Sequence, residues 1–277
     1  MDQHALPAPD IIAPRRPLPL LLSIPHSGCA YPSWLVRESA GGIAALETLE
    51  DPLVDRLAWR ALASGVGGVI ARTPRAAIDC NRSPDEIDPA VVTGATPSSS
   101  PRAIAGLGIV PGRTARHGHL WRRRIARAEL DRRIALVHAP YHAAIERGLD
   151  RLAIVYGGAL LLDCHSMPPR HGQAELVIGD RHGTSATRAL TDAAARIARS
   201  RGWSVALNVP YAGGYIVERH GRPAAGIQAI QLEIDRNCYL GPEGRAPGPG
   251  FDRAAQLLEH LVYGLAEMLE LTAVAAE

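Results

Sequence analysis

Two histidines and one glutamate stand at or near the ends of short apolar runs that have the pattern of buried strands. His26 follows the run in LPLLLSIPHSG, His165 follows the run in GALLLDCHSMP, and Glu233 lies inside the run AIQLEI. In open α/β sheets the loops after the strands converge at one edge, so a common rim is expected for these side chains. Two neutral imidazoles with a carboxylate form the protein ligand set of a catalytic zinc ion. The alternative is that each histidine is a hydrogen-bonded structural residue.

The segment LEDPLVDRL (49–57) offers three candidates for the acidic ligand, namely Glu50, Asp51 and Asp55. An aspartate before Pro52 is also a good helix N-cap, because proline is favoured at the first helical position. Local sequence alone therefore leaves two interpretations of Asp51, as a helix cap and as a metal ligand.

Glu233 is harder to explain by packing alone. A carboxylate within an apolar strand must be paired or functional to offset the cost of removing it from water. Asp235 and Arg236 follow it closely, and they could interact with Glu233 or pair with each other.

The stretch RTPRAAIDCNRSP (72–84) places four polar residues after another strand-like run: Arg75, Asp79, Asn81 and Arg82. A guanidinium group binds a substrate carboxylate in a bidentate manner or polarises a carbonyl oxygen. The alternative is a salt bridge between Arg82 and Asp79 or Asp85.

The stretch NVPYAGGYI (208–216) joins a glycine pair to flanking tyrosines, Tyr211 and Tyr215. Glycines permit close approach of the backbone to a ligand, and they equally mark a plain tight turn. Asn208 and Tyr215 are the candidate substrate contacts of this segment.

These residues can lie close together only if a sheet brings the strand ends to one edge. The sequence contains the alternating strand and helix patterns that such a sheet requires. Apolar runs predict strands at 18–24, 67–72, 159–164, 176–178, 203–207 and 227–234. Helical periodicity predicts helices at 52–63, 116–136, 142–151, 185–201 and 252–271. We expect Thr184 or Ser185 to cap the fourth helix and Pro140 to separate the second from the third. The alternation indicates an α/β fold with a parallel or mixed sheet covered on both faces.

The proline-rich residues 1–17 are expected to form a flexible leader, and 18–277 a single domain. Residues 83–113 fit no element and are expected to be either a lid over a site or a mobile loop.

Composition excludes several classes of function. Of the 277 residues, 47% are hydrophobic and 21% charged, and the net charge of +2 gives no field for wrapping nucleic acid. No segment approaches the roughly 20 apolar residues of a membrane span, so neither nucleic acid nor membrane is an expected partner. Four scattered cysteines and an N-terminus unlike a signal peptide predict a cytoplasmic protein. The sequence leaves the oligomeric state open.

Six motifs in order, IPHSG, DCNRSP, LLDCHSMP, VIGDRHGTS, NVPYAGGYI and IQLEIDRNCY, resemble the N-formylglutamate amidohydrolase (N-formylglutamate deformylase) family over roughly residues 20–265. The resemblance implies a three-layer α/β/α sandwich around a mixed, mostly parallel sheet, similar to zinc carboxypeptidases. It makes His26, Asp51 and His165 the ligands of one zinc ion. The carboxypeptidase-like His-x-x-Glu pair is absent, since Cys29 follows His26 by three residues, and Glu50 is the reserve for the acidic ligand.

The resemblance also implies an activity, which is hydrolysis of N-formyl-L-glutamate or a related N-acyl amino acid, with a place in histidine degradation. Glu233 is similar to the catalytic glutamate of carboxypeptidases, and would take a proton from the attacking water and return it to the departing amine. Arg75 is the candidate for stabilising the oxyanion, and Asn81 and Arg82 are similar to a pair that holds the substrate carboxylate. Two alternatives are a hydrolase of other acyl or peptide specificity and a catalytically silent metal-binding protein.

Overall fold

The computed structural model describes residues 5–16, 18–96 and 98–274. Its described residues cluster into two compact units. Unit 1 takes in the described part of 1–10 together with Pro25–Glu50 and Ile70–Ala143, and unit 2 takes in Ile11–Ile24, Asp51–Val69 and the described part of 144–277.

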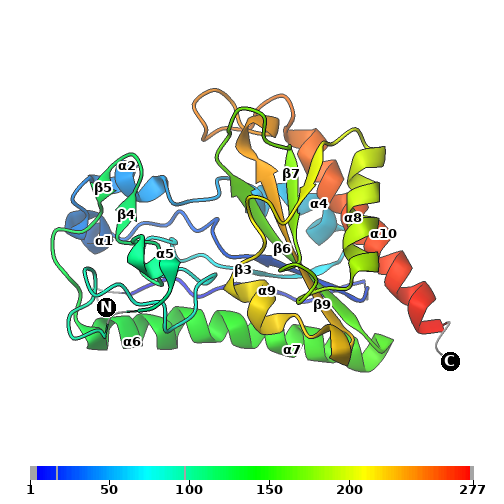
Figure 1. The fold of residues 1–277 in the computed structure, drawn as a ribbon, viewed down its shortest axis with the longest axis horizontal. Coiled ribbons are helices and arrows are strands. Elements are labelled where there is room, and N and C mark those ends of the chain that lie inside the picture. The colour runs from blue at the N-terminus through cyan, green and yellow to red at the C-terminus, as the bar shows by residue number, and fades with distance from the viewer. Residues whose placement is uncertain (1–4, 17, 97, 275–277) are drawn as a thin grey trace. The chain divides into compact units, whose positions relative to one another are not determined.

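A mixed sheet forms the centre of unit 2 (Figure 1). Within the described residues its strand order is β1-β3-β2-β6-β9-β7-β8. The strands are β1 (Asp10–Ile12), β2 (Leu20–Ile24), β3 (Gly67–Ile70), β6 (Ala159–Met167), β7 (Leu176–Gly179), β8 (Val205–Leu207) and β9 (Ile227–Asp235). Strand β6 runs parallel to both β2 and β9, and β7 runs parallel to β8 but antiparallel to β9. Every residue of β6 and β9 is buried, as expected for central strands covered on both faces.

Helices cover both faces of this sheet. The helices of unit 2 are α3 (Val54–Leu57), α4 (Trp59–Ala63), α8 (Arg188–Ser200), α9 (Tyr215–His220), α10 (Phe251–Val274), most of α7 (Ala139–Tyr156) and the 3₁₀ turns Pro223–Ala225 and Arg236–Cys238. Gly148 of α7 lies against Leu21, whereas Leu62 of α4 lies on the side of the neighbouring Leu22. Because adjacent strand residues point to opposite faces, α7 and α4 belong to different layers.

Helix α10 packs against α4 and α8, and Figure 1 shows α8 and α10 side by side beside the sheet. The predicted three-layer α/β/α sandwich with a mixed, mostly parallel sheet is confirmed. Among the described helices, none is both long and apolar enough to cross a membrane.

Unit 1 has less regular structure. Its described elements are α1 (Ser33–Glu38), α2 (Gly42–Glu47), α5 (Pro101–Ile104), the hairpin of β4 (Arg113–Thr114) and β5 (Gly118–His119), α6 (Arg127–Arg133), a π-helical turn (Ile134–His138) and the start of α7. Its core consists of apolar side chains from α1, α2 and the segments around them: Trp34, Leu35, Ala45, Leu46, Leu49, Ala76, Ala77 and Leu120.

The predicted strands are all present, with ends shifted by up to three residues, and four predictions about helices are wrong. The helix expected at 116–136 begins only at Arg127, because the hairpin occupies 113–119. The helix expected at 52–63 is split into α3 and α4. Thr187, not Thr184 or Ser185, is the N-cap of α8.

Pro140 does not separate two helices, which is the fourth correction. Helix α6 continues through the π-helical turn into α7, which contains Pro140. A proline inside a helix removes one backbone donor, and a wider helical turn just before it is a known way to accommodate that loss.

Two expectations about flexible segments stay predictions. The proposed leader lies partly outside the described residues, at 1–4 and 17, and its described part includes β1. Residues 83–113 carry α5, and Pro97 lies outside the described residues.

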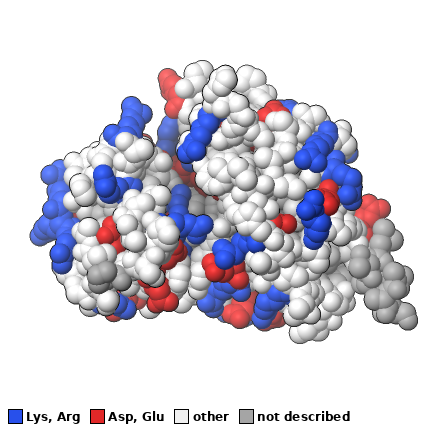
Figure 2. Space-filling view, in the orientation of Figure 1, with Lys and Arg blue, Asp and Glu red and all other residues white. Residues whose placement is uncertain are grey.

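Over the face shown in Figure 2, arginine and acidic side chains are interspersed.

One buried carboxylate holds the turn after β7. Asp180 accepts hydrogen bonds from the Gly183 backbone at 3.0 Å, from Asn208 Nδ2 at 2.8 Å and from Thr191 Oγ1 at 2.8 Å. Residues 181–182 have φ of 52° and 57°, which non-glycine residues rarely adopt. Burial alone would raise the pKa of Asp180, but these donors outweigh it and lower the pKa below its usual value.

Asp180→Asn should therefore destabilise the protein by about 1–3 kcal/mol in urea unfolding near pH 7, because an amide cannot accept from all three donors. A carboxylate whose pKa is lowered by folding stabilises above its unfolded pKa of about 3.9, and this contribution disappears as the pH falls through the lower folded value. The difference from the unmodified protein should thus narrow below about pH 4.

Asp192→Asn is the matched control, because Asp192 is partly exposed and pairs with Arg188 on the same helix. Its cost should stay below about 0.5 kcal/mol. Equal costs for the two variants would contradict the role given to Asp180.

Candidate metal and catalytic site

A row of polar side chains crosses the centre of the sheet on one face. In register, Asp163 of β6 is opposite Ser23 of β2 and Gln231 of β9, and His165 is opposite Glu233. Residues in register on parallel strands, and residues two apart on one strand, point to the same face. The two strands therefore place His165 and Glu233 side by side, as the shared rim predicted from the sequence requires.

His165 is held in one orientation by a buried carboxylate. Its Nε2 lies 2.8 Å from Asp163 Oδ2, and Asp163 Oδ1 accepts a hydrogen bond from Ser23 Oγ at 2.7 Å. Since a carboxylate accepts, Nε2 of His165 donates its proton to Asp163. Nδ1 lies 3.1 Å from Asp51 Oδ2. Burial alone would lower the pKa of His165, but Asp163 and Asp51 outweigh it and hold the pKa well above its usual value.

Asp51 belongs to this site and not to a helix end. The N-cap of α3 is Leu53, so the predicted capping role is wrong. Asp51 Oδ1 accepts a hydrogen bond from Arg236 Nη2 at 3.1 Å, and Arg236 Nε donates to Ser166 Oγ at 3.1 Å. The preceding residue, Glu50, instead accepts a hydrogen bond from the hydroxyl of Tyr31.

His26 is held in the same manner as His165. It follows β2 by two residues, and its Nε2 lies 2.8 Å from Oδ1 of the fully buried Asp79. Asp79 Oδ2 also accepts a hydrogen bond from Arg75 Nε at 2.8 Å and lies 3.9 Å from Arg82 Nη1. Burial alone would raise the pKa of Asp79, but the charges of Arg75, His26 and Arg82 hold it well below its usual value.

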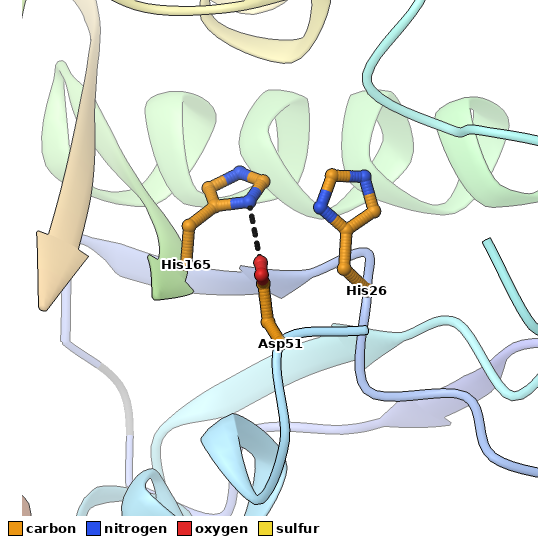
Figure 3. Close-up of side chains that lie close together, drawn as sticks. All are labelled: His26, Asp51 and His165. Atoms are coloured by element: carbon orange, nitrogen blue, oxygen red, sulfur yellow. Dashed lines mark hydrogen bonds and ion pairs between the residues drawn. The ribbon is translucent and has the colours of Figure 1, made fainter. Parts of the chain in front are cut away.

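The three predicted metal ligands lie together. One potential ligand atom from each of His26, Asp51 and His165 lies within 4.8 Å of the others, and all three residues are buried (Figure 3). Both histidines use Nε2 for a carboxylate, which makes Nδ1 the candidate ligand atom of each. Two imidazole nitrogens and one carboxylate oxygen fit the donor set of a catalytic zinc ion. Asp51, and not Glu50 or Asp55, is the acidic member of this group.

Glu233 has one strong neighbour on its own strand. Gln231 Nε2 donates to Glu233 Oε1 at 2.8 Å, and Gln231 Oε1 accepts from the Gly214 backbone at 2.8 Å. Of the two other residues considered as its partners, Asp235 accepts from Gln173 Nε2 and Arg236 donates to Asp51. The amide donor reduces the cost of burying the Glu233 carboxylate.

The candidate substrate contacts come from two segments, one with Asn81 and Arg82 and the other with Asn208 and Tyr215. Arg82 Nε donates to Leu107 O and its Nη1 donates to Asn81 O, both at 2.8 Å. Asn208 uses its side-chain amide within the turn around Asp180, and Tyr215 accepts from Arg219 Nη1 at 3.2 Å near the surface. These contacts give no support to the predicted substrate roles of Asn208 and Tyr215.

Tyr211, from the same segment, lies close enough to Glu233 for its charge to act on the phenol. Burial raises the pKa of Tyr211, and the charge of Glu233 raises it further. The phenol therefore stays protonated near neutral pH and remains a hydrogen-bond donor.

Sequence reasoning missed the pairing of Arg236 with Asp51 and the use of one carboxylate, Asp79, by both His26 and Arg75. It also missed His138 and His142, whose spacing of four residues was the available signal, because His138 lay in the predicted break around Pro140. The contacts of Arg236 with Asp51 and of Asp79 with His26 join residues far apart in the chain, so no local sequence pattern indicates them.

Comparison with known proteins identifies relatives over most of the chain. The sequence profile of N-formylglutamate amidohydrolase matches residues 18–240. An N-formylglutamate deformylase of Pseudomonas putida is 32% identical over 80% of this chain and 82% of its own length. An N-formylglutamate deformylase of Pseudomonas aeruginosa is 31% identical over 91% of this chain and 92% of its own length.

A solved structure of the same family has a similar fold. The crystal structure of N-formylglutamate amidohydrolase from Ralstonia eutropha JMP134 has a TM-score of 0.84 and 30% identity, and the match covers 95% of this chain and 98% of that one. The chain therefore belongs to the N-formylglutamate amidohydrolase family.

Proposed function

We propose that this protein is a metal-dependent amidohydrolase that converts N-formyl-L-glutamate and water into formate and L-glutamate. The observation that carries the proposal is the group formed by His26, Asp51 and His165, with Glu233 in register beside His165. Relatives named N-formylglutamate deformylase at 31–32% identity support the choice of substrate.

The metal proposed for this group is one zinc ion. His26 and His165 would hold it through Nδ1, because their Nε2 atoms are committed to Asp79 and Asp163, and Asp51 would supply an oxygen. A zinc ion bound there would supply Lewis-acid chemistry and lower the pKa of a water molecule. Ligating histidines typically donate their other ring N–H to a carboxylate, as both do in this chain.

Glu233 is the proposed general base and acid. Its carboxylate takes a proton from the attacking water and later returns it to the amine nitrogen as the C–N bond breaks. The hydrogen bond from Gln231 orients Oε1 of this carboxylate. A metal site without catalysis would not need this buried carboxylate.

Arginines provide the proposed electrostatic contacts. Arg82, with Asn81, binds a carboxylate of the substrate, because a planar guanidinium matches carboxylate geometry. Arg75, oriented by Asp79, stabilises the charge that develops on the formyl oxygen.

The proposal also includes the cytoplasmic location predicted from the sequence and a role in histidine degradation. The four cysteines are free thiols, which fits a reducing compartment.

Release of formate from a panel of N-formyl amino acids tests the proposed function. N-formyl-L-glutamate should have the highest kcat/KM, and N-acetyl-L-glutamate a much lower one. Equal turnover of many acyl groups would favour a general deacylase, and a zinc-loaded protein with no turnover would contradict the proposed activity.

Adjacent carboxylates offer a matched test of the metal ligands. Asp51→Asn should weaken zinc binding by more than the roughly 10–100-fold typical of losing a group that only orients a ligand. Glu50→Gln should retain zinc, because Glu50 interacts with Tyr31. Zinc content after equilibration with a chelator measures both, and the opposite order would make Glu50 the ligand.

Glu233→Gln separates catalysis from metal binding. The amide keeps an oxygen for Gln231 but cannot accept a proton, so kcat should fall by about 10²–10⁴-fold. Zinc content and Tm should remain near those of the unmodified protein, because Glu233 is not a proposed ligand.

Glu218→Gln provides the control, since Glu218 is an exposed carboxylate paired with Arg181, and it should leave kcat unchanged. Loss of zinc in Glu233→Gln would make Glu233 a ligand. Retention of full activity would remove it from the mechanism.

A further inference from the structure

The segment that carries Asp79, Asn81 and Arg82 is held by side chains of one helix. Arg133 Nη1 donates to Ala77 O, His142 Nε2 to Cys80 O and His138 Nε2 to Arg82 O, each at 2.9 Å. A carbonyl oxygen accepts only, so Nε2 carries the proton in both histidines. Residues 77–82 form no named strand, and these donors satisfy carbonyl groups that a neighbouring strand would otherwise satisfy.

The two histidine rings lie against each other. His138 ends the π-helical turn and His142 lies in α7, both are buried, and their ring centroids are 4.4 Å apart. Residues four apart on a helix lie on the same face, so both rings reach the same segment. Single π-helical turns inside longer helices are frequent at functional sites.

Their acceptors lie on either side of Asn81. The Cys80 carbonyl precedes Asn81 and the Arg82 carbonyl follows it, so the two bonds fix the backbone from which both proposed carboxylate-binding side chains extend. The Arg82 guanidinium is itself oriented by Leu107 O and Asn81 O. Among the described residues, no hydrogen bond engages Arg82 Nη2, which leaves that amino group for a ligand.

We propose that His138 and His142 are positioning residues for substrate specificity, which hold Asn81 and Arg82 in the geometry that selects a carboxylate over a carboxamide. This inference rests on the proposed function, because it assigns the carboxylate of N-formyl-L-glutamate to Arg82. The histidines touch no substrate, and they act through the backbone of residues 80–82.

The test compares kcat/KM for N-formyl-L-glutamate with kcat/KM for its two monoamides, N-formyl-L-glutamine and N-formyl-L-isoglutamine. The ratio is insensitive to the fraction of protein that is folded or zinc-loaded, because that fraction affects all three substrates equally. A merely structural role for the histidines would leave it unchanged.

His138→Met and His142→Met remove the donor at similar volume and should lower the preference for the carboxylate by about tenfold, the change that corresponds to about 1.4 kcal/mol. His138→Gln and His142→Gln retain an N–H donor at a similar distance along the side chain and should recover most of the preference. His220→Met is the matched control, a buried histidine in α9 of unit 2, and should leave the ratio unchanged.

Coupling to Arg82 makes the test specific. In an Arg82→Gln background, His142→Met should have no further effect on the ratio, because the group it positions is gone. An unchanged ratio in the methionine variants would overturn the proposal. So would methionine variants that fail to fold while the glutamine variants fold, since the hydrogen bonds would then serve stability alone. A parent protein that releases no formate would instead contradict the proposed function.

Discussion

Two buried carboxylate–histidine pairs fix the chemistry of this site. Asp79 and Asp163 are both fully shielded from solvent, and each accepts the Nε2 proton of one histidine at 2.8 Å. Because Nε2 of each histidine faces a carboxylate, Nδ1 is the candidate ligand atom of His26 and of His165, and Asp51 adds an oxygen to the same group. Each carboxylate therefore places the proton on Nε2 and fixes the orientation of the imidazole ring.

The same two carboxylates connect the histidines to the rest of their units. In unit 2, Asp163 joins β6 to β2 through Ser23, on the face where His165 and Glu233 are neighbours. In unit 1, Asp79 binds His26 and Arg75 with its two oxygens and also accepts the Asn81 backbone N–H. A group that orients a proposed metal ligand thus also orients a proposed catalytic arginine, so a substitution at Asp79 would disturb both.

Local sequence patterns were sufficient for the strands and for the types of residue at their ends. The apolar runs before His26 and around His165 and Glu233 are strands β2, β6 and β9, and their parallel order brings the polar ends together. The resemblance to a family was needed to choose Asp51, because proline after an aspartate predicts a helix cap equally well. The roles of the site residues remain proposals.

Other features depend on contacts that no local pattern contains. Arg236 reaches Asp51 across 185 positions, and the donors from His138 and His142 reach carbonyls about 60 positions earlier in the chain. Pro140 failed as a helix break because the preceding π-helical turn accommodates it. Asn208 was predicted to contact the substrate, and in the structure its side-chain amide donates to Asp180 in the turn after β7.

A crystal structure of the zinc-loaded protein, with anomalous scattering measured at the zinc edge, tests the central claim most directly. One anomalous peak should lie about 2.0–2.1 Å from Nδ1 of both His26 and His165, with an Asp51 oxygen at about 2.0–2.2 Å. Both Nε2 atoms should keep their bonds to Asp79 and Asp163. A peak bound through either Nε2, or one that lacks His26 or His165 as a ligand, would contradict it.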